Sequence, residues 1–260
     1  MDIEAKVDDE VAPMEFLSSG RVNSGAGKIA ALQAAIDAKN AALLNHRYFR
    51  LCRTKEMSRK QIIEIVKQLY CFSVFFERLL TRRIAEYSTA MDARVIEIAR
   101  KHLREEIGHA GLFLHCLEAN GVPVDEVTRV TPKMFTKAMF GYLTATIQHE
   151  NEYVSNVAIM QVMESIGYHF FSATLEVMRR HDLMADAMVE HTEDDQEHAH
   201  LGVELAAQFD DRTMRDCTRV IGDLYRLMGF VLDEWLGVHR ESPSAAPERT
   251  RRTSRPPRSN

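Results

Sequence analysis

Apolar residues recur along most of the chain with the three- to four-residue spacing that is typical of amphipathic helices. No stretch shows the alternation of apolar and polar residues that would predict a half-buried strand. Inside the periodic region, prolines occur only at Pro123 and Pro132. The pattern predicts seven helices, over residues 28–46, 58–88, 91–120, 133–163, 165–181, 183–209 and 211–239. We therefore expect an all-α fold in which long helices with short links form a compact bundle.

Capping and helix-stop residues support two of these helix boundaries. The composition of the two terminal segments distinguishes them from the predicted bundle. Ser58 is a suitable N-cap for the second helix, and Gly121 followed by Pro123 predicts the end of the third. Residues 1–27 contain scattered glycines and a proline with little periodicity, which predicts a disordered N-terminal segment. Residues 241–260 are rich in proline, serine and arginine, which predicts a disordered basic tail. The remaining residues, 28–240, form one predicted helical domain.

Composition narrows the range of partners. The formal net charge is −5, so the chain as a whole is not expected to bind nucleic acid. No apolar run approaches the roughly 20 residues that a membrane-spanning helix needs, and no secretory signal pattern begins the chain. The four cysteines are widely spaced without a CxxC pair, which favours a reducing, cytoplasmic compartment. We expect a protein that acts on a small molecule and forms a homodimer, without a membrane or nucleic-acid partner.

The most informative motif is the run from Glu190 to Ala199, which has the spacing H-x3-D-x2-H. On a helix, positions i, i+4 and i+7 lie on one stripe, so His191, Asp195 and His198 would point the same way. Two imidazoles and a carboxylate in this arrangement form half of a metal site. The alternative is a polar surface stripe, because neighbouring residues of the run are also charged.

Two further segments offer ligands to the same site. Glu106 and His109 are three residues apart in a helix with a buried face, as in carboxylate-bridged di-iron bundles. Glu164 lies in an apolar stretch and has no basic residue one helical turn away. A buried carboxylate needs a cation or a hydrogen-bonding partner, so a metal or a group from another helix is expected beside it.

Together these segments provide six candidate ligands: Glu106, His109, Glu164, His191, Asp195 and His198. Nitrogen and oxygen ligands without thiolate indicate iron or manganese rather than structural zinc. Six ligands suit two cations that share a carboxylate, and two redox metals with open positions would bind and reduce dioxygen.

The chain resembles the heme-oxygenase-like di-iron oxidases and oxygenases, whose relatives include thiaminase-II-like and pyrroloquinoline-quinone-synthase-like proteins. The resemblance covers roughly residues 40–210 and is most specific from His191 to His198. It also includes the opening segments at 45–49 and 57–62, the region 103–122 and the segment around Glu164. It implies a seven-helix heme-oxygenase-like bundle, two Fe(II) ions and dioxygen as co-substrate, with an external electron donor as a possible partner.

Two other acids compete for a ligand role. Some members of the family place the glutamate further upstream of the histidine, which makes Glu105 an alternative to Glu106. Glu77 lies among aromatic residues and resembles the extra, mobile ligand that some relatives use. The alternative for Glu77 is a surface salt bridge with a nearby arginine such as Arg82. The link between Glu164 and His191 is also shorter than the resemblance leads us to expect.

The resulting expectation is an iron-dependent oxidase or oxygenase that acts on a small organic substrate. The first expectation is N-oxygenation or a related oxidation of an amine or amino acid in specialised metabolism, with Arg78, Arg82 or Arg83 as a charged anchor. The second is oxidative desaturation or decarboxylation of an aliphatic acid in an apolar channel. Two alternatives remain: a cofactorless thiaminase-like hydrolase using Cys71 or Cys116, and a non-catalytic helical binding protein.

Overall fold

A computed structural model describes residues 24–87 and 92–237 of the chain. The described residues form α-helices and two shorter helical segments of other types, with no strand among them, which confirms the all-α prediction. The helices are α1 (Gly25–Leu43), α2 (Arg47–Arg53), α3 (Arg59–Glu86), α4 (Ala93–Glu106), α5 (His109–Ala119), α6 (Val124–Thr128), α7 (Met134–His149), α8 (Glu152–Asn156), the π-helix η3 (Val157–Met163), α9 (Glu164–Arg180), α10 (Asp186–His198), the 3-10 helix η4 (Val203–Gln208) and α11 (Asp211–Trp235).

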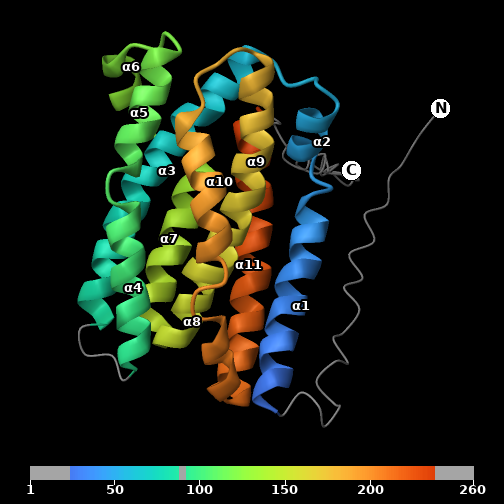
Figure 1. The fold of residues 1–260 in the computed structure, drawn as a ribbon, viewed down its shortest axis with the longest axis vertical. Helices are drawn as coiled ribbons and strands as arrows, with labels where there is room; N and C mark the ends of the chain where they lie inside the picture. The colour runs from blue at the N-terminus through green and yellow to red at the C-terminus, as the bar shows by residue number, and fades with distance from the viewer. Residues whose placement is uncertain (1–23, 88–91, 238–260) are drawn as a thin grey trace, which may run out of the picture.

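The long helices run side by side along the longest axis of the molecule (Figure 1). Helix α5 continues the direction of α4, α10 packs against α9, and α1 lies beside α11. Short helices α2 and α6 lie toward one end of the bundle and α8 toward the other. None of the helices that the structure describes is long and apolar enough to cross a membrane.

The predicted helix boundaries at Ser58 and Gly121 are confirmed. The Ser58 hydroxyl accepts a hydrogen bond from the Gln61 amide, and the Gln61 side chain accepts one from the Ser58 amide, forming a capping box. Gly121 adopts a φ of +88° just after α5, a backbone conformation that favours glycine. Helix α1 begins at Gly25 rather than at 28, because the Ser24 side chain caps it. Of the predicted disordered segment 1–27, residues 25–27 belong to α1, and residues 1–23 lie outside the described residues, as does the predicted tail 241–260.

Four predicted helices have other limits in the structure than expected. The helix predicted over 91–120 is divided between α4 and α5, because Gly108 adopts a φ of +104° that interrupts the helical path. The break predicted near 164 lies instead at Asn151, whose side chain caps α8, so the helical path from 152 to 180 continues through η3 and α9. Helix α10 ends at His198 instead of reaching 209, and Gly202 turns the chain into η4 with a φ of +80°.

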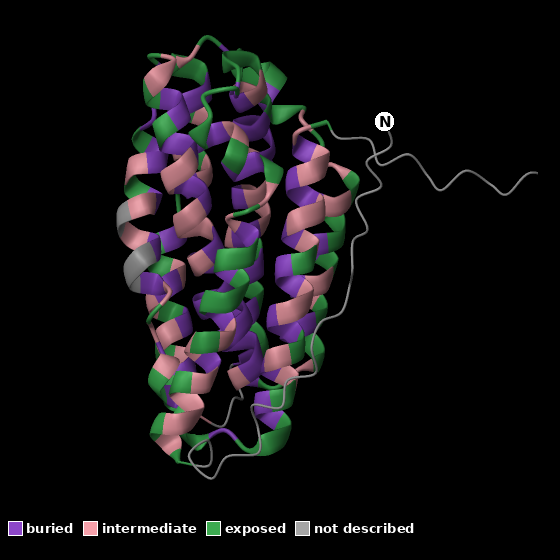
Figure 2. Ribbon diagram, turned by 90° about the vertical axis from the view of Figure 1, so that its right-hand side faces the viewer, coloured by how far each residue is buried: buried purple, intermediate pink, exposed green. Residues whose placement is uncertain are grey.

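Purple, buried faces line the inside of the bundle along its whole length (Figure 2). Segment η3 is buried over all of its residues, and α3, α9 and α11 contribute apolar side chains to the same core. Packing of these apolar faces provides the main stabilisation of a helical domain, because the hydrophobic effect scales with the apolar area removed from water. Charged side chains buried in this core therefore call for specific partners.

Candidate metal centre

Seven ionisable side chains from α4, α5, α9 and α10 meet inside the bundle. Each is at most 5% exposed; they are His102, Glu106, His109, Glu164, His191, Asp195 and His198. The burial of His191, Asp195 and His198 shows that the alternative of a polar surface stripe was wrong.

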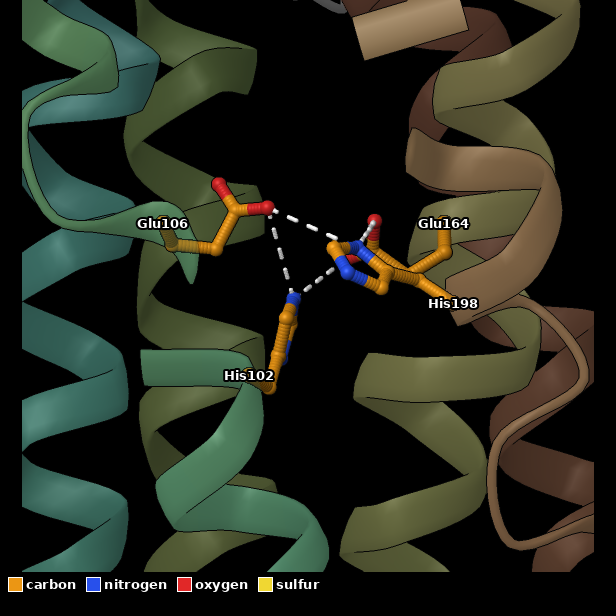
Figure 3. A group of neighbouring side chains, drawn as sticks. All are labelled: His102, Glu106, Glu164 and His198. Carbon is orange, nitrogen blue, oxygen red and sulfur yellow. Dashed lines mark ion pairs between the residues drawn. The ribbon is translucent and has the colours of Figure 1, made fainter. Parts of the chain in front are cut away.

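Four of these side chains face one another as a compact group (Figure 3). His102 Nε2 lies 3.2 Å from Glu164 Oε1 and 3.6 Å from Glu106 Oε1. The second histidine contacts the same two glutamates: His198 Nδ1 lies 3.6 Å from Glu164 Oε2 and 3.7 Å from Glu106 Oε1. One donor atom from each residue lies within 4.8 Å of the other three. We call these four residues the inner group.

Glu106 also belongs to a second buried group with His109 and His191. His109 Nδ1 lies 3.0 Å from Glu106 Oε2, and the His109 and His191 rings are 4.4 Å apart between their centroids. Because Glu106 has an oxygen near each group, its carboxylate is placed as a bridging ligand would be.

Asp195 lies beside both groups, although it is a member of neither. Its pKa is raised well above the ordinary value by burial and by the carboxylates of Glu164 and Glu106. Gly167 makes room for it, because a Cβ at position 167 would overlap Asp195 Oδ2. A cation beside it would stabilise its ionised form.

Hydrogen bonds on the far side of two imidazoles fix which nitrogen faces the centre. His191 Nδ1 lies 2.7 Å from the Ala187 carbonyl oxygen, so it donates its proton there and leaves Nε2 as the ligand atom. His198 Nε2 lies 3.1 Å from Glu105 Oε2, which leaves Nδ1 facing the glutamates of the inner group. Orientation of a ligand imidazole by a carbonyl or a carboxylate is a regular feature of protein metal sites.

The donor atoms of the inner group fit a divalent cation. Glu106 Oε1, His198 Nδ1 and His102 Nε2 face one another, are buried, and have no hydrogen-bond partner among the described residues. A buried polar atom without a partner is costly. The nitrogen-to-oxygen separations of 3.2 to 3.7 Å in this group place its donors close enough to share one cation.

The pKa values of His102 and Glu106 are shifted because imidazoles and carboxylates lie close together in the buried centre. Burial alone would lower the pKa of His102, but the neighbouring carboxylates of Glu164 and Glu106 outweigh it and raise the pKa to about 9. Burial would raise the pKa of Glu106, yet His102 and His109 lower it well below its usual range. Cation binding to such a set must release protons, because the imidazoles bind a metal only in the neutral form.

The local backbone explains how Glu106 and Glu164 reach the centre. Glu106 is the last residue of α4, and the turn at Ile107 and Gly108 places His109 at the start of α5. Glu164 directly follows the π-helix η3, and such segments are frequent at functional sites because they shift the side chains that follow.

The structure brings all six predicted ligands together, while their role in metal binding stays a prediction. Sequence reasoning missed His102, although the spacing H-x3-E-x2-H from His102 to His109 repeats that of the predicted run from His191 to His198. The two weaker candidates have other contacts. The Glu105 carboxylate is hydrogen-bonded to His198 Nε2, the ring nitrogen that points away from the centre. Glu77 Oε1 accepts hydrogen bonds from the amides of Gly108 and Ala110 at the start of α5, and forms no salt bridge that the structure records.

A cavity of about 70 Å³ lies directly beside the centre. Its apolar wall includes Phe72, Phe76, Phe113, Phe171 and Trp235, and it also contains Glu106, Glu164, His191 and Asp195. Ser73 is the one other polar side chain among the described residues that line it. No lysine, arginine or cysteine belongs to this lining.

The arginines expected as substrate anchors have other positions. Arg78 is exposed. Arg82 forms an ion pair with Glu86 at 3.5 Å. Arg83 is fully buried and donates to Asn156 Oδ1 at 2.6 Å. The cavity therefore has no cationic anchor among the described residues.

Comparison with known proteins identifies the fold. No protein-family model matches the chain, and no curated protein does. Among solved structures, a domain of unknown function with a heme oxygenase-like fold from Shewanella denitrificans is similar with a TM-score of 0.69 and 15% identity, covering 80% of this chain and 92% of that one.

Two further structures show the same likeness. A TenA homolog from Pseudomonas syringae pv. tomato has a TM-score of 0.64 at 11% identity, covering 85% of this chain and 98% of that one. A CADD-like protein of unknown function from Nostoc punctiforme has a TM-score of 0.63 at 13% identity, covering 80% and 98%. The resemblance drawn from the sequence is thus confirmed at the level of architecture: the chain has the heme-oxygenase-like fold.

Proposed function

We propose that the protein is an oxidase or oxygenase that uses two iron(II) ions and dioxygen to oxidise a small, mainly apolar organic substrate. The observation that carries this proposal is the convergence of buried donor atoms without hydrogen-bond partners on one point beside an apolar cavity. Imidazole and carboxylate ligands without thiolate favour iron or manganese. Bound in this way, such ions would supply the electrons and the open coordination positions that reduction of dioxygen requires.

The chain's own residues would hold the metals and exclude water. His102, Glu106, Glu164 and His198 would hold one ion, and Glu106, His109 and His191 the other. Asp195 lies beside both groups and would complete the second, three-donor set. Aromatic side chains on the cavity wall keep the site apolar, which protects reactive species from water and strengthens electrostatic interactions inside.

The cavity lining bears on the substrate class. A free amino acid would need a cationic partner for its carboxylate, and no arginine or lysine lines the cavity among the described residues. An aliphatic acid or an amine with an apolar body fits better, with its polar group at the metals and its apolar part against the phenylalanines. Oxidative desaturation or decarboxylation of an aliphatic acid is therefore a second candidate beside oxidation of an amine.

The lining does not favour a thiaminase-like hydrolase. Cys116 donates to the Met184 carbonyl and Cys71 to the Val130 carbonyl, and neither lines the cavity. Burial raises the pKa of Cys116 to about 11, which keeps its thiol protonated and poorly nucleophilic near neutral pH.

Anaerobic loading with Fe(II) tests the proposal. We expect about two ions bound per chain, and a transient visible absorption band with consumption of dioxygen after mixing with oxygenated buffer. Aliphatic acids and apolar amines of increasing length are then compared for oxygen consumption in single-turnover reactions. Binding of no iron would overturn the proposal, and binding of a single ion would overturn the two-metal assignment. A homodimer and an external electron donor remain predictions. Neither is needed for metal loading or for a single turnover, so these measurements do not test them.

A further inference from the structure

A third group of possible ligands lies at the surface beside the buried centre. It consists of His109, Glu190 and Asp194, whose donor atoms lie within 4.8 Å of one another. The Glu190 side chain is 50% exposed, whereas His109 is only 4% exposed. We call this set the outer group; it connects solvent to the buried centre through one imidazole.

The two nitrogens of His109 face opposite ways. Nδ1 lies 3.0 Å from Glu106 Oε2 inside the centre. Nε2 lies 3.7 Å from Glu190 Oε1, which is longer than a hydrogen bond. His109 Nε2 thus faces two carboxylates at the surface, and its contact with Glu190 is a long ion pair, so a divalent cation could bind between the three donors.

The corresponding carboxylate on the other side of the centre behaves differently. Glu105 accepts a hydrogen bond from His198 Nε2 at 3.1 Å and is also paired with Lys101 at 3.3 Å. Its position is that of a group which orients a ligand imidazole. Glu190 lies farther from its histidine and forms no ion pair with a lysine or arginine among the described residues, so it holds His109 less firmly than Glu105 holds His198.

We propose that Glu190, Asp194 and His109 Nε2 form a transient site for a divalent cation, through which metal enters the buried centre. This inference rests on the proposed metal-dependent function. The ligands of the inner and second groups are at most 5% exposed, so an entering ion must exchange its water for protein ligands in stages. Two surface carboxylates would attract the hydrated ion, and His109 is the residue common to the outer group and to the second buried group.

The chain carries its own reporter for this process. Trp235 is the single tryptophan, and it lines the cavity that also contains Glu106 and Asp195. Paramagnetic Mn(II) or Fe(II) that reaches the centre should quench its fluorescence. Stopped-flow mixing of apoprotein with Mn(II) under anaerobic conditions then gives a rate of arrival, independent of any catalytic activity.

The variant to compare with wild type is Glu190→Gln combined with Asp194→Asn. We expect its quenching rate to fall about tenfold, since electrostatic steering commonly contributes at least that factor. The number of ions bound at equilibrium should stay unchanged. Glu118→Gln combined with Glu176→Gln is the matched control, because it removes the same charge from exposed positions on α5 and α9. The control should keep the wild-type rate.

The outcomes separate the two proposals. Equal rates for the variant and wild type, with normal stoichiometry, would overturn the entry site and leave the metal centre intact. A lower final stoichiometry in the variant would also overturn it, because Glu190 and Asp194 would then be permanent ligands. Wild-type protein that binds no metal would overturn both proposals.

Discussion

The segments 102–109 and 191–198 have the same spacing of histidine, acid and histidine, but the backbone is interrupted in the first and helical throughout in the second. In α10 the three residues lie on one uninterrupted helix and face the centre as a stripe. In the other segment, the helical path is broken between Glu106 and His109 by the positive φ of Gly108. Glu106 then contributes to both buried donor groups, whereas Asp195 contributes to neither.

The difference shows that spacing alone does not assign roles at a two-metal site. A continuous helix keeps neighbouring ligands about one turn apart, so each side chain reaches one position along the axis. The 3.0 Å contact between Glu106 and His109 is one that residues three apart on an unbroken helix also make, so what distinguishes Glu106 is that its two oxygens face different groups. Glu106 is therefore the carboxylate expected to bridge.

Removal of the acid from each segment is the strongest test of this comparison. Glu106→Ala should lower bound Fe(II) from about two ions per chain to fewer than one, because both donor groups lose a ligand. Asp195→Ala should retain at least one ion, since the four donors of the inner group remain. Metal is counted after anaerobic loading and gel filtration, with Glu118→Ala as control. Equal losses in the two variants would show that the segments are equivalent.

The second test concerns His102, the residue that only the structure revealed. His102→Ala should lose one ion and keep the other, because His109 and His191 remain. The apoprotein should also lose roughly 3 kcal/mol of unfolding free energy, as expected when one partner of a buried charge pair is removed. Denaturant unfolding measures this, with the exposed His115→Ala as control. Full retention of two ions would exclude His102 as a ligand.

The sequence predicted the helical class and the six ligand candidates, because both depend on periodicity that is local to the chain. It did not predict the break at Gly108, since a single glycine inside a periodic pattern is compatible with a continuous helix. The break does not explain the omission of His102, because the spacing from His102 to His109 repeats that of the run from His191 to His198 and was available in the sequence. The π-helix before Glu164 was likewise invisible, because its extra residue per turn depends on tertiary packing. These two irregularities place Glu106 and Glu164.

A third, smaller effect is expected when the break itself is changed. Gly108→Ala places a side chain at a φ of +104°, which should cost at least about 1 kcal/mol of unfolding free energy. Any relief of this strain toward a continuous helix would shift Glu106 and His109 from their present positions and weaken metal binding. Gly111→Ala is the control, because it lies in α5 where a Cβ meets no atom within 4 Å. It should be neutral or slightly stabilising. If Gly108→Ala kept the wild-type unfolding free energy and metal binding, the break at Gly108 would not be what distinguishes the two segments.

The smallest expected effect concerns Glu105, which the sequence left open as a metal ligand. The test distinguishes a partner that orients His198 from a direct ligand. Its carboxylate lies 3.1 Å from the outer nitrogen of His198, and its side chain is 38% exposed. An orienting partner of this kind typically contributes a factor of about 10 to 100 in metal affinity. Glu105→Ala should therefore weaken Fe(II) binding by about tenfold while two ions still bind at saturation, and Glu105→Gln should fall between it and wild type. Competition with a chromogenic chelator measures the affinity. Loss of an ion at saturating metal would instead make Glu105 a direct ligand, and α4 would then provide two carboxylates to the centre, Glu105 and Glu106.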